Sequence, residues 1–470
     1  MILQGAAVPA ASVARGVLRH PLPAGMRDRL PEDARLEAEL SRRLLGSFEL
    51  HGYEQVGVPA FEFAEVLERG LGSFAPGEVL RFVEPESGEV VALRPDMTPQ
   101  LARLVATRLA SAPLPARLSY QGSVLRRPLE RARTQRQVLQ AGVELVGLSG
   151  VEADLEILEL AVASVQRAGL SYAVLDLSHA GITGPLLEPL EPERRDEVAL
   201  ALSLKDQSQL EALTEGAPLS AVDRAALRAL PQLHGGEALW PRAERLLAGS
   251  SAERGVRELH LLWTRARALG VPVLADLGEV RAFRYYSGFL FQLLAEGPGR
   301  PLVSGGRYDG LLGRFGESRP AAGMAVDVDR LRLALARTGE LPGRGARVLV
   351  APELLALTSA LRAARLPCAV GPTDDRAAYA AAWRYTHRLE LESAGLVLHP
   401  VGSSMGRAGS TGLAGSSVES TIDSSAAAAA VSQSVASTRW AEASEAERVA
   451  LEVRRLIEAP VGAGPGAEGS

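Results

Sequence analysis

The sequence predicts an α+β protein in which helices flank an antiparallel sheet, followed by a small C-terminal α/β module. Two patterns lead to this fold class. Between residues 53 and 327, strand-like segments come as hairpins and meanders that helical segments interrupt. Between residues 346 and 400, the order changes to strand, helix, strand, helix, strand, which is typical of a small parallel sheet.

Length and composition limit the class of protein. The 470 residues exceed one ordinary domain of roughly 150 residues, and hydrophobic residues, at 47%, suffice for a packed core. No run of 18 apolar residues predicts a membrane span. Cys368, the only cysteine, excludes an internal disulfide and a cysteine-rich zinc site. The cytoplasm is therefore the simplest compartment, and we expect no membrane partner. The net charge of −5 argues against a nucleic-acid partner.

The elements of the first half follow from periodicity and turn residues. Leucines at helical spacing predict a helix over 31–52, and residues 53–59 alternate like a strand. Residues 79–94 form a predicted hairpin, and a helix follows Pro95. Further along we expect strands at 116–122, 138–147 and 171–177, with a helix at 151–168.

The second half begins with a helical pattern that lacks strand signals. From residue 272 the strands resume at 272–276, 286–294, 301–304 and 322–327, with helices at 308–315 and 330–339. In the C-terminal module, residues 376–394 read as one helix and 396–398 as a strand. The expected organisation is a flexible arm at 1–20, a core at 21–184 and 269–340, a helical insertion at 185–268, the α/β module at 346–400, a low-complexity linker at 402–437, a helix at 438–458 and a flexible tail at 459–470.

Metal and lysine chemistry are poorly supported by the sequence. The seven histidines are scattered, without the spacing of a metal motif, so we predict no metal site. The only lysine, Lys205, lies in no phosphate-binding or Schiff-base motif.

Polar residues in otherwise apolar strands are better candidates for a site. Gln140 and Glu144 are four apart, so on a strand they share one face, which is either a pocket wall or a solvated surface. Asp96 precedes a helix and is either a site residue or a helix cap. Arg281 with Tyr285 and Tyr286 suits recognition of a carboxylate and a small polar ring, or lies on the sheet surface.

Taken together and in order, the motifs between Arg27 and Arg330 resemble the catalytic core of class II histidyl-tRNA synthetases. The resemblance is closest to the ATP phosphoribosyltransferase regulatory subunits, a paralogous family without aminoacylation activity. The blocks that carry it are residues 23–31, 52–62, 93–100, 122–144, 304–311 and 323–330. The implied fold is the class II aminoacyl-tRNA synthetase-like antiparallel sheet.

The resemblance also implies roles for individual side chains. In a histidine-binding pocket, Asp96 and Thr98 face the amino group and Gln140 reaches the amino-acid backbone. Glu144 accepts from the imidazole with Tyr286 beside it, and Arg281 faces the carboxylate. A remnant of a phosphate pocket is implied for the following two residues: Arg126 and Arg330.

Three departures from the synthetases weaken the case for catalysis. Pro128 stands where the synthetases have a glutamate that orients adenine, and Arg284 replaces an aspartate before the tyrosine pair. The loop at 130–135 lacks their glycine–arginine pair. Residues 346–400 are either a shortened anticodon-binding domain or an independent module.

The resemblance therefore implies a non-catalytic regulatory subunit without catalytic residues or cofactor. Its expected partner is the short-form ATP phosphoribosyltransferase catalytic subunit, with histidine as feedback effector and a homodimer within the hetero-oligomer. The leading alternative is a divergent histidyl-tRNA synthetase, which must bind ATP and tRNA. A general histidine-binding paralogue is a third possibility.

Overall fold

The chain divides into two compact units, Met1–Pro342 and Gly343–Ser470. The computed structural model describes residues 22–23, 25–71, 79–126, 135–280, 285–393, 395–401, 420–421 and 443–458. The predicted arm at 1–20 and tail at 459–470 lie outside these residues, as does the predicted linker apart from 420–421. None of the described helices is both long enough and apolar enough to cross a membrane.

The first unit is built on a sheet of nine described strands in the order β1-β5-β6-β12-β11-β10-β7-β9-β8. Its strands are β1 Glu54–Gln55, β5 Ala116–Leu125, β6 Gln137–Val146, β7 Val174–His179, β8 His234–Gly235, β9 Val273–Asp276, β10 Phe289–Leu294, β11 Val303–Arg307 and β12 Ala321–Asp327. Apart from the parallel pairs β1–β5 and β7–β9, neighbouring strands are antiparallel, which confirms the predicted sheet type.

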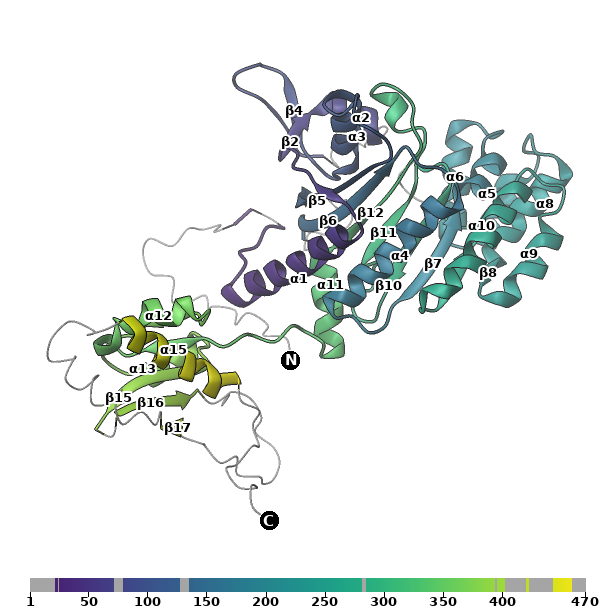
Figure 1. Cartoon of the computed structure of the whole chain (residues 1–470). Coiled ribbons are helices and arrows are strands. Elements are labelled where there is room, and N and C mark those ends of the chain that lie inside the picture. Colours follow the sequence, from purple (N-terminus) through teal and green to yellow (C-terminus); the bar gives the residue numbers. More distant parts are fainter. Residues whose placement is uncertain are drawn as a thin grey trace, which may run out of the picture. The chain divides into compact units, whose positions relative to one another are not determined.

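One face of this sheet is covered by α1 (Pro31–Leu50) and α4 (Val151–Ala168), which lie side by side over it (Figure 1). Leu40, Leu44 and Phe48 of α1 are fully buried in the same core as Ile157 and Leu158 of α4. α11 (Val328–Thr338) joins this core through its apolar residues. Burial of these leucines and aromatics, each contributing roughly 1.5–3 kcal/mol, fixes the sheet against the helices.

The opposite face carries α3 (Thr98–Thr107) and a smaller sheet of order β2-β4-β3. The strands of this small sheet are β2 Phe61–Phe63, β3 Arg81–Val83 and β4 Val90–Leu93, next to α2 (Ala64–Leu71). β3 and β4 are the predicted hairpin, now extended by a third strand.

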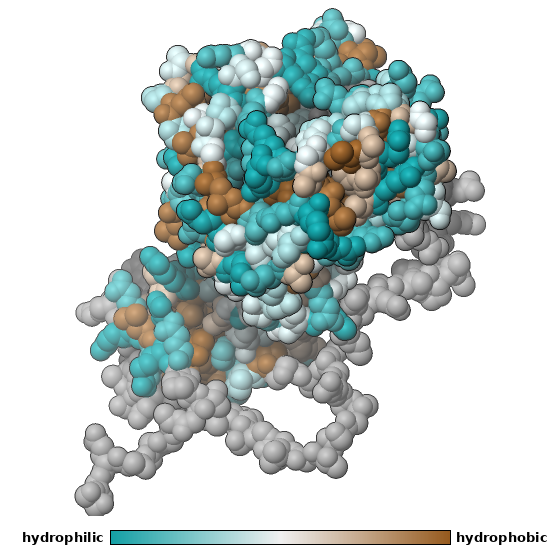
Figure 2. Space-filling model, turned by 90° about the vertical axis from the view of Figure 1, so that its right-hand side faces the viewer, coloured by the Kyte–Doolittle hydropathy of each residue, from teal (hydrophilic) through white to brown (hydrophobic). Residues whose placement is uncertain are grey.

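The predicted insertion is mostly helical, but it also contains the short strand β8, which the sequence did not predict. Its helices gather at the β7 and β8 end of the sheet (Figure 1). They are α5 Ala180–Leu187, α6 Pro192–Ser203, α7 Gln207–Thr214, α8 Ala221–Ala229, α9 Trp240–Leu246 and α10 Glu253–Ala266. The surface at this end shows apolar side chains in several places among polar ones (Figure 2). Exposed apolar residues of this kind are ordinary on a protein surface.

The second unit has a five-stranded sheet of order β14-β13-β15-β16-β17. Its elements are β13 Val348–Val350, α12 Leu357–Ala363, β14 Cys368–Val370, α13 Arg376–Ala382, β15 His387–Glu392, β16 Gly395–Pro400, β17 Ser420–Thr421 and α15 Ala443–Glu458. Val449, Ala450 and Val453 of α15 are buried against the core beside α12. The C-terminal helix is therefore part of this unit, and β17 falls inside the segment that we predicted as a linker.

Three predicted elements differ in the structure. The predicted helix at 376–394 ends at Ala382, because Arg384 adopts a left-handed φ of 56° and residues 387–392 then form β15. The predicted helix at 308–315 is only a 3-10 turn at Leu312–Arg314, in a segment rich in glycine, which disfavours helices. The predicted strand at 53–59 is reduced to β1, which pairs with β5 at the edge of the described sheet.

Candidate functional site

Side chains of β6 point alternately to the two faces of the sheet, one facing the core and the other facing the candidate site. Ala141, Val143 and Leu145 point into the core under α1 and α4. Gln140 and Glu144 therefore lie on the other face, and they are only 4% and 3% exposed. The alternative of a solvated strand face is excluded, so these polar groups need partners within the protein or from a ligand.

Asp96 lies where the chain turns from β4 into α3. Its Oδ1 accepts a hydrogen bond from the Met97 backbone N–H at 2.9 Å, and its Oδ2 accepts one from the Tyr285 hydroxyl at 3.5 Å. The N-cap residue of α3 is Met97, so Asp96 lies one residue before the cap and its carboxylate accepts from the backbone at the start of the helix. The carboxyl group is buried, and burial raises its pKa.

Glycines on β11 and β12 allow side chains to approach the sheet closely. A Cβ at Gly323 would overlap the Tyr308 hydroxyl and come within 2.5 Å of Glu144 Oε2. A Cβ at Gly306 would come within 3.0 Å of the Tyr286 ring. Only glycine leaves room for both tyrosines here.

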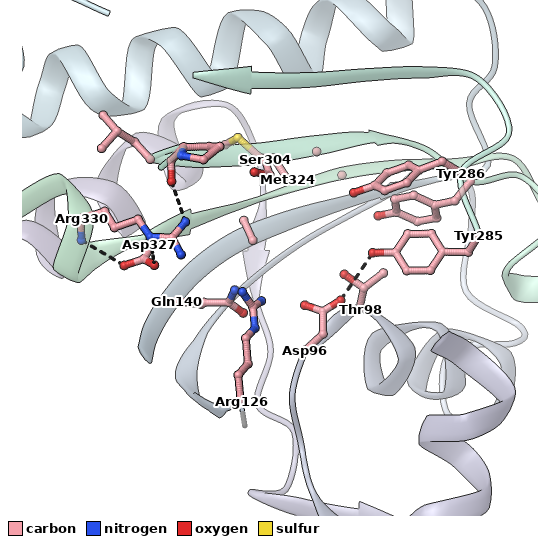
Figure 3. A pocket seen from close by; sticks show the side chains of 16 residues that line it. Asp96, Thr98, Arg126, Gln140, Tyr285, Tyr286, Ser304, Met324, Asp327 and Arg330 are labelled. Carbon is pink, nitrogen blue, oxygen red and sulfur yellow. Dashed lines mark hydrogen bonds and ion pairs between the residues drawn. The ribbon is translucent and has the colours of Figure 1, made fainter. Parts of the chain in front are cut away.

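These elements enclose a cavity with about 610 Å³ of empty space, including its open mouth. Its walls come from the loop before α3 and the start of α3, from the residue after β5, from β6, β11 and β12, from the segment before β10, and from the start of α11 (Figure 3). The lining residues are Asp96, Thr98, Arg126, Gln140, Tyr285, Tyr286, Pro301, Leu302, Ser304, Gly305, Tyr308, Gly323, Met324, Ala325, Asp327 and Arg330.

One end of the cavity is formed by a hydroxyl–carboxylate cluster, which we define as Thr98, Glu144 and Tyr308. Thr98 Oγ1 donates to Glu144 Oε1 at 2.9 Å, and the Tyr308 hydroxyl donates to Glu144 Oε2. Burial raises the pKa of Glu144 well above its usual range, while the Thr98 hydrogen bond opposes this rise. Tyr285 and Tyr286 extend the wall, with their ring centroids 4.7 Å apart.

The other end, which we call the arginine end, contains Arg126, Gln140, Asp327 and Arg330 (Figure 3). Arg126 Nε donates to the Pro95 carbonyl at 2.9 Å. The buried Gln140 Oε1 accepts no hydrogen bond from the residues that the structure describes. A buried acceptor without a donor costs about 1–3 kcal/mol, so a ligand donor at this atom would be favourable.

The structure brings most of the predicted site residues together. Six of the predicted residues line the cavity: Asp96, Thr98, Gln140, Tyr286, Arg126 and Arg330. Glu144 does not line the cavity itself. It accepts hydrogen bonds from Thr98 and Tyr308, and the side chains of these two residues line the cavity. Arg281, Pro128 and Arg284 fall outside the described residues.

Sequence reasoning missed two residues of the site, Tyr308 and Asp327. Tyr308 was visible as part of the glycine-rich turn at 305–310, but its bond to Glu144 spans 164 residues of sequence. Asp327 could be recognised as a polar residue that ends an apolar strand just before a helix, although that pattern alone indicates only a cap.

One group of potential metal ligands occurs in the second unit among the described residues. Glu390, Glu392 and His399 have ligand atoms close enough to share an ion. Glu390 Oε1, however, already accepts from Arg388 at 2.8 Å and from Arg376 at 3.3 Å. The two guanidinium groups already compensate the negative charge of Glu390, so binding of a metal cation at this group is unfavourable.

Comparison with known proteins first identifies the fold. A family model described as Histidyl-tRNA synthetase matches residues 25–331. A solved structure from Bacillus halodurans C, described as an ATP phosphoribosyltransferase regulatory subunit/histidyl-tRNA synthetase, has a TM-score of 0.67 at 28% identity and covers 78% of this chain and 97% of that one. Histidyl-tRNA synthetase from Nostoc sp. has the same TM-score at 21% identity, covering 82% and 95% of the two chains, which supports the fold alone. The fold and the cavity thus define a class II, histidyl-tRNA synthetase-like protein.

Curated relatives specify the family within this class. An ATP phosphoribosyltransferase regulatory subunit from Anaeromyxobacter sp. (strain Fw109-5) is 44% identical over 329 residues, which is 69% of this chain and 96% of the relative. The protein of the same name from Moorella thermoacetica is 38% identical over 348 residues, or 73% and 89% of the two chains. The chain belongs to the ATP phosphoribosyltransferase regulatory subunit family. This confirms the family that the sequence motifs indicated, and its members are named as regulatory rather than catalytic subunits.

Proposed function

We propose that this chain is the non-catalytic regulatory subunit of a short-form ATP phosphoribosyltransferase, and that its cavity binds histidine as feedback effector. The observation that carries the regulatory role is the 44% identity over 96% of a relative with that name. Matches that span nearly the whole relative argue for a shared role of the whole protein. The role is in the first step of histidine biosynthesis.

The charges of the cavity support a zwitterionic amino acid as ligand. Asp327 and Arg330 form an ion pair at 2.9 Å, whereas Asp96 and Arg126 make no direct ion-pair contact with any described residue. Arg126 acts on Asp96 through space and opposes the rise in its pKa. An α-ammonium facing Asp96 and a carboxylate facing Arg126 would satisfy both. Charge-assisted hydrogen bonds of this kind are worth roughly 1.5–3 kcal/mol each.

The remaining lining residues suit an imidazole side chain. The hydroxyl–carboxylate cluster provides oriented hydroxyl groups, and the tyrosine rings provide faces against which a small aromatic ring can stack. Gln140 Oε1 offers a further acceptor for the ammonium group. We include Arg281 in the proposed site on the basis of the family motif, as a second partner for the carboxylate.

Co-purification tests this function. The chain, co-expressed with a tagged short-form catalytic subunit, should be retained with it and raise its phosphoribosyltransferase activity. Histidine should inhibit the complex and bind more tightly to the inhibited state, since coupling between the two sites is reciprocal. A catalytic subunit that neither retains the chain nor responds to it would contradict the proposal.

A divergent histidyl-tRNA synthetase is the second candidate, because the matching family model carries that description. Such an enzyme would catalyse histidine-dependent exchange between ATP and pyrophosphate. We expect no exchange above background, and a robust exchange rate would favour the synthetase over the regulatory subunit.

We also propose that the chain forms a homodimer within the hetero-oligomer, in the cytoplasm. Phe61 and Phe63 on β2 are 43% and 49% exposed, and Phe82 beside them is 41% exposed. An exposed aromatic surface of this kind is typical of an interface. Sedimentation of the isolated chain at micromolar concentration should show at least a dimer, and monomer alone would contradict the proposal.

The compartment is proposed from the cysteine content. A chain with one cysteine gains little from an oxidising compartment, which supports the cytoplasm.

A further inference from the structure

The arginine end of the cavity contains a carboxylate in an unusual place. Asp327 is the last residue of β12 and the N-cap of α11, and it lines the cavity with its side chain only 9% exposed. A pocket with two arginines normally suits phosphate, which guanidinium groups bind in a bidentate manner. At this end, however, one of the two arginines already has a fixed anionic partner.

Asp327 holds Arg330 through two contacts. Its Oδ1 accepts from the Arg330 backbone N–H at 3.0 Å, and its Oδ2 lies 2.9 Å from Arg330 Nε. The Nη1 atom of Arg330 donates to the Pro301 carbonyl at 2.8 Å. Two of the three guanidinium nitrogens are thus occupied from within the protein.

This arrangement has a consequence for anions. A phosphate oxygen approaching Arg330 would have to displace Asp327 or lie beside its carboxylate in a largely buried site. Two like charges that share one cation repel each other, and the repulsion is stronger in a largely buried site than in water. The repulsion grows with the charge of the ligand, so it acts most strongly against di- and triphosphates.

We infer that Asp327 is a specificity-determining residue: it is an internal counter-ion for Arg330 that excludes di- and triphosphate groups and leaves the cavity to a zwitterionic ligand. The inference rests on the proposed function, because it concerns the same cavity. It explains how two arginines can line the cavity without making it a nucleotide site.

The test uses the full chain and inorganic pyrophosphate as probe, titrated by calorimetry. The variant Asp327→Asn removes the charge but keeps the size and the capping ability, since asparagine caps helices as well as aspartate does. Wild-type protein should bind pyrophosphate weakly or not measurably at millimolar concentration, and Asp327→Asn should bind it at least tenfold more tightly than the wild-type affinity or its detection limit. Asp327→Ser, also a good cap, provides a second variant if the first does not fold.

Two controls separate the specific effect from a general change in charge. Asp329→Asn alters the charge of the same helix by the same amount, but Asp329 pairs with Arg27 and Arg29 and does not line the cavity. Because Asp329 acts on Arg330 only through space, Asp329→Asn should gain much less affinity for pyrophosphate than Asp327→Asn. Adding Arg330→Met to Asp327→Asn should abolish the gain.

Three outcomes would overturn the inference: wild-type protein that binds pyrophosphate as tightly as Asp327→Asn, folded Asp327 variants that bind none, or an equal gain in Asp329→Asn. Histidine is titrated separately into wild-type protein. Failure of histidine to bind contradicts the proposed effector role, and the comparison with pyrophosphate remains valid in that case.

Discussion

The two ends of the cavity satisfy their polar groups in opposite ways. In the hydroxyl–carboxylate cluster, both oxygens of Glu144 accept hydrogen bonds from neighbouring side chains. At the arginine end, Gln140 Oε1 accepts none from the described residues, and Arg126 has no carboxylate partner among them. The first end is organised before any ligand arrives. At the second end the pair between Asp327 and Arg330 is also formed in advance, and Gln140 and Arg126 are the groups that a ligand would complete. Because the side chains of the hydroxyl–carboxylate cluster are already held in place, a ligand that contacts them loses less conformational entropy on binding.

The largest effect should come from filling the space that the cluster needs. Gly323→Ala places a methyl group against the Tyr308 hydroxyl and within 2.5 Å of Glu144 Oε2 and the Val143 carbonyl. We expect the free energy of unfolding of the first unit to fall by about 3 kcal/mol, at the upper end of the range for overpacking. Urea denaturation measures this loss.

The matched control for that variant is Gly310→Ala. No heavy atom lies within 4 Å of a Cβ at Gly310, so its stability should stay close to that of the wild type. Equal stability of the two variants would mean that the hydroxyl–carboxylate cluster can rearrange around the added methyl group. The cluster would then be less rigidly organised than the structure implies.

A change in the acceptor of the cluster should weaken binding with less effect on folding. In Glu144→Gln, one of the two carboxylate acceptors becomes an N–H donor, so either Thr98 or Tyr308 must turn its hydroxyl away. We expect at least a tenfold loss of histidine affinity by calorimetry, or about 1.4 kcal/mol. Inhibition of the complex should shift to higher histidine concentrations while basal activity is retained.

Glu156→Gln is the appropriate comparison for this variant. Glu156 also accepts from a tyrosine hydroxyl, that of Tyr53 at 2.9 Å, but it does not line the cavity. Its histidine affinity should equal that of the wild type. Unchanged affinity in Glu144→Gln as well would assign the cluster a purely structural role.

The smallest effect is expected at the arginine end, and there stability and binding should change in opposite directions. Gln140→Met keeps the size of the side chain but removes the buried acceptor that has no donor. The melting temperature of the free protein should stay the same or rise, whereas histidine affinity should fall about three- to tenfold, as for one neutral hydrogen bond.

Gln137→Met on the same strand serves as control, because Gln137 does not line the cavity and donates to Ser123 Oγ at 3.1 Å. If the melting temperature of Gln140→Met falls and its affinity is unchanged, Gln140 has a partner within the protein and does not await a ligand.

Local patterns predicted the parts of the molecule that depend on neighbouring residues. The helix at 151–168 matches α4 residue for residue, and the spacing of Gln140 and Glu144 correctly placed both on one face of β6. The error at 387–392 is also local, since Leu389 and Leu391 alternate with glutamates as in a strand, and the alanine-rich helix before them concealed this pattern.

What the sequence could not predict depends on contacts over long distances. Tyr308 reaches Glu144 only because β12 lies between β11 and β6, and no local pattern contains that order. In the same way, the pairing of Asp327 with Arg330 is visible as a cap, but its place in the cavity follows from the register of β12 with β6, where Asp327 lies opposite Gln140.

That register also determines when the site can exist during folding. Val146 on β6 lies opposite Ala321 on β12, and Asp96 is 189 residues from Tyr285. Closing such long loops is slow, whereas the β5–β6 hairpin and the helices of the insertion form from local contacts. A partly folded chain would therefore have most of its secondary structure and no binding site. Ligand binding should return last on refolding, which makes it a stricter test of the native state than circular dichroism.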